Sequence, residues 1–208
     1  MNRNDAQGND GEAFLLFFSH LQSDTATTLI DTYKEYLAGN ISITQLQQAF
    51  VTTLKGAHVQ AAHLGRRMAG VTDPLHPADE AFAQTVMFEQ ARYLSGLISD
   101  IRGGRYPSVG EAVNSDLARR IRMYADRLLG TFNATWRLAL PVGTMLDWVL
   151  GVPETNHCQT CPQRAAGGPY DAHLVTFDPG DGTSECGVLC LCRWQIVGGA
   201  SGPTAARI

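Results

Sequence analysis

The chain has 208 residues, a mass of 22.5 kDa and a hydrophobic fraction of 44%, enough for one large domain or two small ones. Its net charge of −4 and isoelectric point near 5.8 exclude a protein that coats nucleic acid through bulk positive charge. No apolar run reaches the ~18 residues that a membrane-spanning helix needs, so we expect no membrane association.

The N-terminal residues 1–11 are rich in Asn, Asp and Gly and predict a disordered tail. They lack the basic start and long apolar core of a signal peptide, so we expect the protein to mature in a reducing cytosol. The dense apolar run FLLFFSHL follows at residues 14–21. It predicts either a buried helical turn or an apolar plug that docks on a partner.

Helical periodicity then continues in segments that Gly and Pro separate. Asp24 is a plausible N-cap, Ser42 with Gln45 matches a capping box, and Pro77 is placed to open a helix. Four helices are predicted, over residues 24–38, 43–69, 77–102 and 113–139. Their apolar stripes would pack against each other. The sequence therefore predicts a mainly α fold, in which a bundle of four to five helices occupies residues 12–142.

Residues 143–198 differ in composition, because Gly, Pro and Cys become frequent. Short β-like runs lie at residues 147–150, 173–177 and 193–197. We predict a small β-rich cysteine module, resembling a zinc knuckle or ribbon, followed by a flexible tail at 199–208. A unit of this size buries little apolar surface and normally needs a staple. Trp136 and Trp148 flank the junction and are expected to cover the module.

All the thiols of the chain lie in this module: Cys158, Cys161, Cys186, Cys190 and Cys192. The Cys-x-x-Cys spacing at 158 and 161 lets two thiolates from one turn reach a single ion. An odd number of thiols cannot all pair within one chain, and a reducing compartment favours metal over disulfides. We therefore predict a structural zinc site with four protein ligands and no open position for a catalytic water.

The second pair of ligands must come from the last three cysteines. Cys186 with Cys190 is slightly favoured, and Cys192 stays possible, although two sulfurs on a regular strand would point to opposite faces. His157 is expected to hydrogen-bond a sulfur rather than bind the ion, because its neighbour Cys158 already does so.

Other chemistries find little support in the sequence. The chain has no nucleotide-binding, serine-hydrolase or zinc-protease motif. The base-deaminase pattern fails, because the proline follows the cysteines in CQTCP and no HxE occurs. The run DPGDGTSE at residues 178–185 lacks the ligand alternation of a calcium loop and predicts a turn that positions Cys186. We expect no enzyme.

The order of these motifs resembles a known family. Trp148-Val149-Leu150, HCxxC, GGPY, PGDGTxxC and CxCxW together look like the C-terminal module of tailed-bacteriophage minor head, or head-morphogenesis, proteins of the Mu type. The resemblance covers about residues 117–197 and is specific mainly in 148–194. The chain departs from the family in having Leu191 between its last two cysteines, and in placing Cys186 near the position of a family histidine.

The resemblance implies a virion structural protein that is made in the host bacterial cytoplasm and built into the phage head in several copies. Its partners would be capsid or portal subunits, with possible DNA contact. The alternative is a cellular zinc-ribbon adaptor, or a nucleic-acid-binding module. The latter would use the arginines of one predicted helix: Arg119, Arg120, Arg122 and Arg127.

Overall fold

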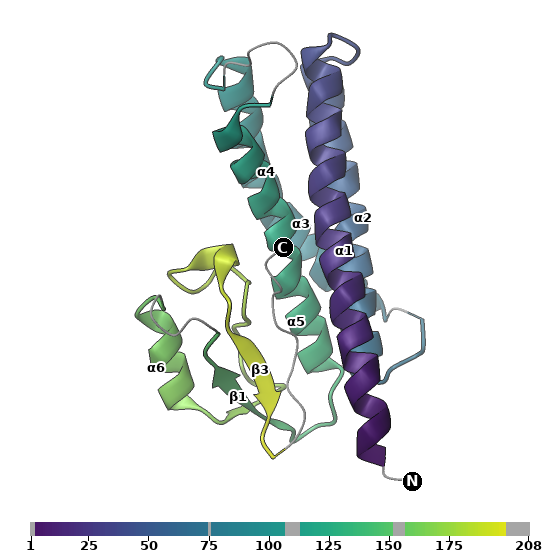
Figure 1. Cartoon of the computed structure of the whole chain (residues 1–208), viewed down its shortest axis with the longest axis vertical. Helices are drawn as coiled ribbons and strands as arrows, with labels where there is room; N and C mark the ends of the chain where they lie inside the picture. The colour runs from purple at the N-terminus through teal and green to yellow at the C-terminus, as the bar shows by residue number, and fades with distance from the viewer. Residues whose placement is uncertain (1–2, 75, 107–112, 152–156, 199–208) are drawn as a thin grey trace.

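The computed structural model describes residues 3–74, 76–106, 113–151 and 157–198, with side chains from Leu15 onward. The fold is mainly helical, with a small antiparallel sheet near the C-terminus, as predicted (Figure 1). The helices are α1 (Arg3–Leu37), α2 (Ile43–Met68), α3 (Pro77–Arg102), α4 (Ser115–Asp126), α5 (Leu128–Leu138) and α6 (Thr160–Gly167). The strands are β1 (Met145–Val149), β2 (Tyr170–Asp171) and β3 (Arg193–Ile196), and a 3-10 helix, η2, spans Gly187–Leu189.

The long helices run side by side along the molecule, and the cysteine module lies beside α5 (Figure 1). Helix α2 is central, because it packs against α1, α3 and α5. It begins at the predicted capping box, in which the Ser42 side chain accepts from the Gln45 N–H and the Gln45 side chain accepts from the Ser42 N–H. Its apolar face, with Leu46, Phe50 and Leu54 fully buried, forms the main core with α1, α3 and α4.

Helix α1 differs from the prediction at its start. It begins at Arg3 and continues through Asp24, so most of the predicted tail at 1–11 is helical and Asp24 caps nothing. Once a helix is nucleated, each further residue adds one hydrogen bond, so a polar lead can extend a helix that is packed further along. The packing is at Phe18, which is buried and stacks on Phe132 with ring centroids 4.5 Å apart. The neighbouring Phe17 points away from this contact and is exposed.

The helix predicted over residues 113–139 is two helices that meet at Arg127. The Gly130 N–H bonds to the Arg127 carbonyl at 3.1 Å, an i→i+3 contact that tightens the turn. The Arg127 guanidinium also reaches the Gly180 carbonyl at 3.4 Å. The bend therefore coincides with the place where the cysteine module docks.

The sheet has the order β2-β1-β3, with both pairs antiparallel. Trp148 of β1 lies opposite Trp194 of β3. Two of the three predicted strands are present, but residues 173–177 are not a strand. The Asp171 side chain accepts from the His173 N–H at 2.8 Å, and the Asp171 carbonyl accepts from the next two N–H groups. This Asx-type turn bends the chain before it can extend. Within the described residues, no helix is long and apolar enough to span a bilayer.

Candidate metal centre

Two loops and one strand end bring the cysteines together. Cys158 precedes α6, and Cys161 lies in the first turn of that helix. Cys186 and Cys190 flank η2, whose 3-10 turn places both at one side of the same short loop. Cys192 directly precedes β3. The five cysteines form one cluster that could hold a metal ion, and all of their thiols are free.

Cys161 is the centre of this cluster. Its Sγ lies 3.3 Å from Sγ of Cys158, 3.6 Å from that of Cys186 and 3.8 Å from that of Cys190. These separations exceed a disulfide bond of about 2.05 Å by more than 1 Å. Two sets of three sulfurs lie within 4.8 Å of one another: Cys158, Cys161 and Cys186; and Cys161, Cys190 and Cys192. The two sets share only Cys161.

The electrostatics of the cluster favour a cation. Burial and then the neighbouring Cys158 raise the pKa of Cys161, and the neighbour Cys192 together with burial raises the pKa of Cys190. Burial also raises the pKa of Cys186, to about 11. Burial opposes ionisation of Cys158 as well, but hydrogen bonds from Cys161 and Cys186 outweigh it and lower this pKa to about 7. Sulfurs packed this closely cannot all be thiolates unless a positive ion shares their charge.

The two cysteine loops are tied to each other and to an aromatic cluster. The Glu185 carboxylate accepts from the Gln159 N–H at 2.9 Å, which joins the loop of Cys186 to the start of α6. Around the sulfurs pack aromatic side chains in edge-on and stacked contacts: Trp148, Tyr170, Phe177 and Trp194. The Arg164 guanidinium lies 4.1 Å from the centroid of the Phe177 ring. As predicted, Trp136 and Trp148 belong to the cluster that covers the cysteines.

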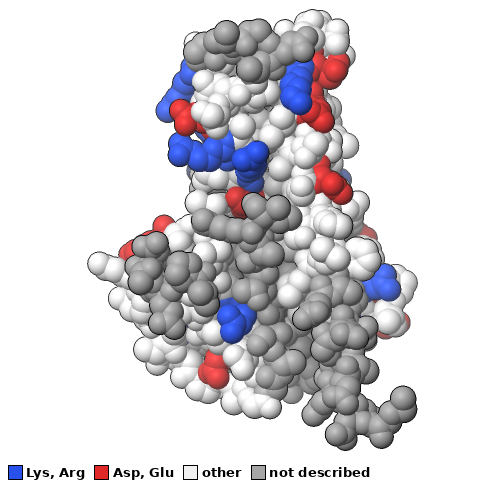
Figure 2. All heavy atoms as spheres, in the orientation of Figure 1, with Lys and Arg blue, Asp and Glu red and all other residues white. Residues whose placement is uncertain are grey.

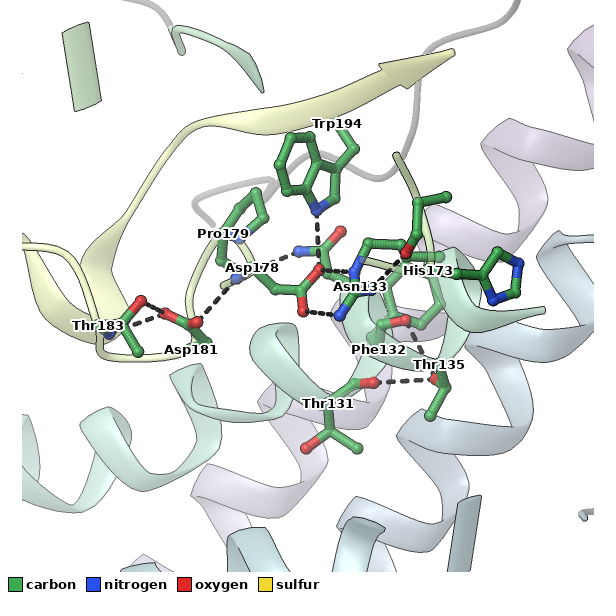
Figure 3. A network of polar contacts seen from close by, with 12 residues as sticks. Thr131, Phe132, Asn133, Thr135, His173, Asp178, Pro179, Asp181, Thr183 and Trp194 are labelled. Atoms are coloured by element: carbon green, nitrogen blue, oxygen red, sulfur yellow. Dashed lines mark hydrogen bonds and ion pairs between the residues drawn. The ribbon is translucent and has the colours of Figure 1, made fainter. Parts of the chain in front are cut away.

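A buried ion pair attaches this module to α5 (Figure 3). The Arg137 guanidinium donates through Nε and Nη2 to the two Asp178 carboxylate oxygens, each at 2.9 Å, and through Nη1 to the Ala172 carbonyl. The Trp194 indole donates to Asp178 Oδ1 at 2.8 Å. Arg137 and Asp178 are 5% and 4% exposed, so solvent does not screen the pair. Arg137 therefore holds two segments of the module against α5, one at Asp178 and one at Ala172.

The PGDGT turn, residues 179–183, is shaped for this docking. Asp181 accepts from the Asp178 N–H and from the Thr183 N–H and hydroxyl, which closes the turn (Figure 3). Asn133 of α5 donates to the Pro179 carbonyl at 2.9 Å. A Cβ on Gly130 would lie 2.7 Å from Asp181 Cα, so only glycine lets the turn approach the helix this closely.

The attachment of the module to α5 was not predicted from the sequence, and the role expected for His157 was wrong. The polar residues of α5, such as Asn133 and Arg137, were the available sign of this attachment. The helix is buried on all sides, and buried polar side chains need hydrogen-bond partners. His157 was expected to hydrogen-bond a sulfur, but its Nε2 is buried without a partner among the described residues. It lies in neither set of clustered ligands. The predicted turn at 178–185 is present, and it also carries the ion pair.

Comparison of the chain with protein-family models, with curated proteins and with solved structures finds no match. The geometry of the site and the resemblance of its motifs therefore carry the functional argument.

Proposed function

We propose that this chain is a structural protein of a tailed-phage virion, acting in head assembly or at the portal or capsid, with a zinc ion as a structural staple. The observation that carries the proposal is the cysteine cluster. The motifs that resemble the phage family, over residues 148–194, contribute every sulfur of the cluster and the turn that docks it on α5. Residues that are far apart in the motif pattern thus lie together in one compact module.

The separations between the Cys161 sulfur and its three neighbours fit zinc. Four thiolates bound tetrahedrally at about 2.3 Å lie about 3.8 Å from one another. Cys161 has three sulfur neighbours at 3.3, 3.6 and 3.8 Å. These neighbours make the set Cys158, Cys161, Cys186 and Cys190 the proposed ligands, and an ion would draw the outer sulfurs together around it. Cys192 groups only with Cys161 and Cys190, and serves as a buried neighbour of the ligands.

A zinc site with four protein ligands stabilises structure and is not catalytic. It leaves no position for a water, and a catalytic zinc needs one. The module's sheet is small, because β2 has only two residues. A metal that joins the start of α6 to the two ends of η2 would supply folding energy that so small a sheet cannot. This supports a rigid, non-enzymatic unit held against the helical bundle.

The nucleic-acid alternative receives less support from the charges. Arg119 pairs with Asp116 at 3.2 Å, Arg120 bonds to Asp100, and Arg127 lies 3.4 Å from Glu89. Figure 2 shows blue and red side chains next to one another over the upper part of this face. A phosphate-binding surface needs positive charge without such compensation. We therefore place assembly with other head proteins ahead of DNA contact.

The location of the protein tests the proposal. Quantitative mass spectrometry of purified particles and of proheads should find this chain at a fixed number of copies per particle. A chain absent from both, in lysates that contain it, would show that it is not a head protein. Binding to duplex DNA that falls steeply with added salt would instead support the nucleic-acid alternative.

A further inference from the structure

The cysteine cluster contains one pair of sulfurs that is poised to react. Cys158 and Cys161 have the shortest sulfur separation recorded in the cluster, 3.3 Å. They are three residues apart at the start of α6, so a bond between them closes only a small local ring. A disulfide of about 2.05 Å would require the two sulfurs to approach by roughly 1.3 Å.

Access to solvent differs between the sulfurs. Cys161, Cys190 and Cys192 are each about 1% exposed, whereas Cys158 and Cys186 are only partly buried. A soluble oxidant therefore meets Cys158 or Cys186 first. The Cys186 sulfur has the Ser184 hydroxyl at 3.2 Å on one side, and its nearest recorded sulfur is Cys161, at 3.6 Å. Cys158 is thus the accessible sulfur with the nearer partner.

We propose that Cys158 and Cys161 form an oxidisable pair, and that a peroxide converts them to a disulfide and so opens the metal site. The inference rests on the zinc site proposed above. Its consequence is a staple that closes in a reducing compartment and is released in an oxidising one. The disulfide would remove Cys161, the sulfur shared by both clustered sets, from the ligands.

The chemistry balances with hydrogen peroxide as the oxidant. The Cys158 thiolate attacks one peroxide oxygen, an S–O bond forms, the O–O bond breaks, and the departing hydroxide takes a proton to become water. The Cys161 thiolate then attacks the Cys158 sulfur, the S–S bond forms, the S–O bond breaks, and the departing hydroxide takes a second proton from solvent and leaves as water. Two electrons pass from the sulfurs to peroxide. The remaining two thiolate ligands each take up a proton as the ion departs.

The sequence offers a clean assay for the pairing. Trypsin cuts after Arg137, Arg164 and Arg193, so Cys158 and Cys161 fall in the peptide 138–164, whereas the other three cysteines fall in 165–193. The full zinc-loaded chain is treated with hydrogen peroxide, its free thiols are blocked, and it is digested without reduction. The first product expected is peptide 138–164 lighter by two hydrogen atoms, with one zinc ion released to a coloured chelator per disulfide. Dithiothreitol with added zinc should reverse both changes.

Two outcomes would overturn the proposal: a first product that cross-links 138–164 to 165–193, or zinc that stays bound after the 138–164 disulfide has formed. Cys192→Ser is the matched control and should give the same disulfide and the same zinc release. Cys158→Ser should give no disulfide within 138–164. If the purified chain holds no zinc, the zinc part of the proposed function fails separately. The reduced, metal-free chain then still tests the pair, with the same first peptide expected.

Discussion

Removing one partner of the buried ion pair between Arg137 and Asp178 should strongly destabilise the molecule. In Asp178→Asn, the side-chain oxygen can still accept from Trp194, but an NH₂ group replaces the oxygen that faces Arg137 Nη2. The guanidinium then stays buried with no counter-charge. Removing one partner of a buried pair costs about 3–5 kcal/mol, and the lost hydrogen bond from Arg137 Nη2, at about 1.5–3 kcal/mol, accounts for part of that figure. Domains of this size are stable by only about 5–15 kcal/mol in total.

The assay is urea unfolding followed by tryptophan fluorescence. The three tryptophans of the chain, Trp136, Trp148 and Trp194, all pack in the cluster around the cysteines, so the signal reports on this region. Zinc must be held constant, because a ligand of the folded state shifts the transition.

The matched control is Asp116→Asn, which breaks the exposed pair with Arg119 and should cost less than about 1 kcal/mol. Adding Arg137→Met to Asp178→Asn should recover part of the loss, because no charge then remains buried. A loss for Asp178→Asn no larger than that of the control would refute the reasoning.

Three further predictions concern other parts of the chain. Burial lowers the pKa of His58 to about 4, so between about pH 6.5 and pH 4 the unfolded protein binds a proton at His58 that the folded protein does not. Stability should therefore fall by roughly 3 kcal/mol as pH drops from about 6.5 to about 4. His58→Gln should lose this component of the urea-unfolding pH profile and the exposed His63→Gln should keep it; identical profiles would contradict the assignment. In α2, a Cβ on Gly65 would collide with Thr135 Oγ1 and the Phe132 carbonyl, so Gly65→Ala should lower the unfolding free energy by about 1–3 kcal/mol. Gly56→Ala on the same helix meets no atom within 4 Å and should raise it by up to about 1 kcal/mol, and equal effects would show that the α2–α5 contact is looser than described. Elemental analysis should find about one zinc per wild-type chain and much less in Cys161→Ser, whereas Cys192→Ser should retain it; the reverse order would exchange Cys192 into the ligand set.

Most of the helical part of the fold could be predicted from the sequence, because the signals for helices are local. The capping box at Ser42 and Gln45, the proline at residue 77 and the 3.6-residue apolar stripes depend only on near neighbours along the chain. The same signals misled at two places. Asp24 looks like a cap but lies inside α1, since the packing of Phe18 carries the helix through it. The long stripe of residues 113–139 hid the break at Arg127, since that break accompanies a contact with Gly180.

The candidate metal site likewise has features that the sequence predicts and features that depend on the tertiary structure. The sequence by itself determined that the thiols are concentrated in one module, that the Cys-x-x-Cys spacing of Cys158 and Cys161 suits one ion, and that a turn precedes Cys186. Only the tertiary structure decided that Cys161 is the shared centre of the sulfurs and that Asp178 reaches Arg137 across 41 residues of chain. The physical reason is that spacing constrains a ligand pair on one turn. Which distant groups meet in a buried, low-dielectric site is set by the packing of whole elements against one another.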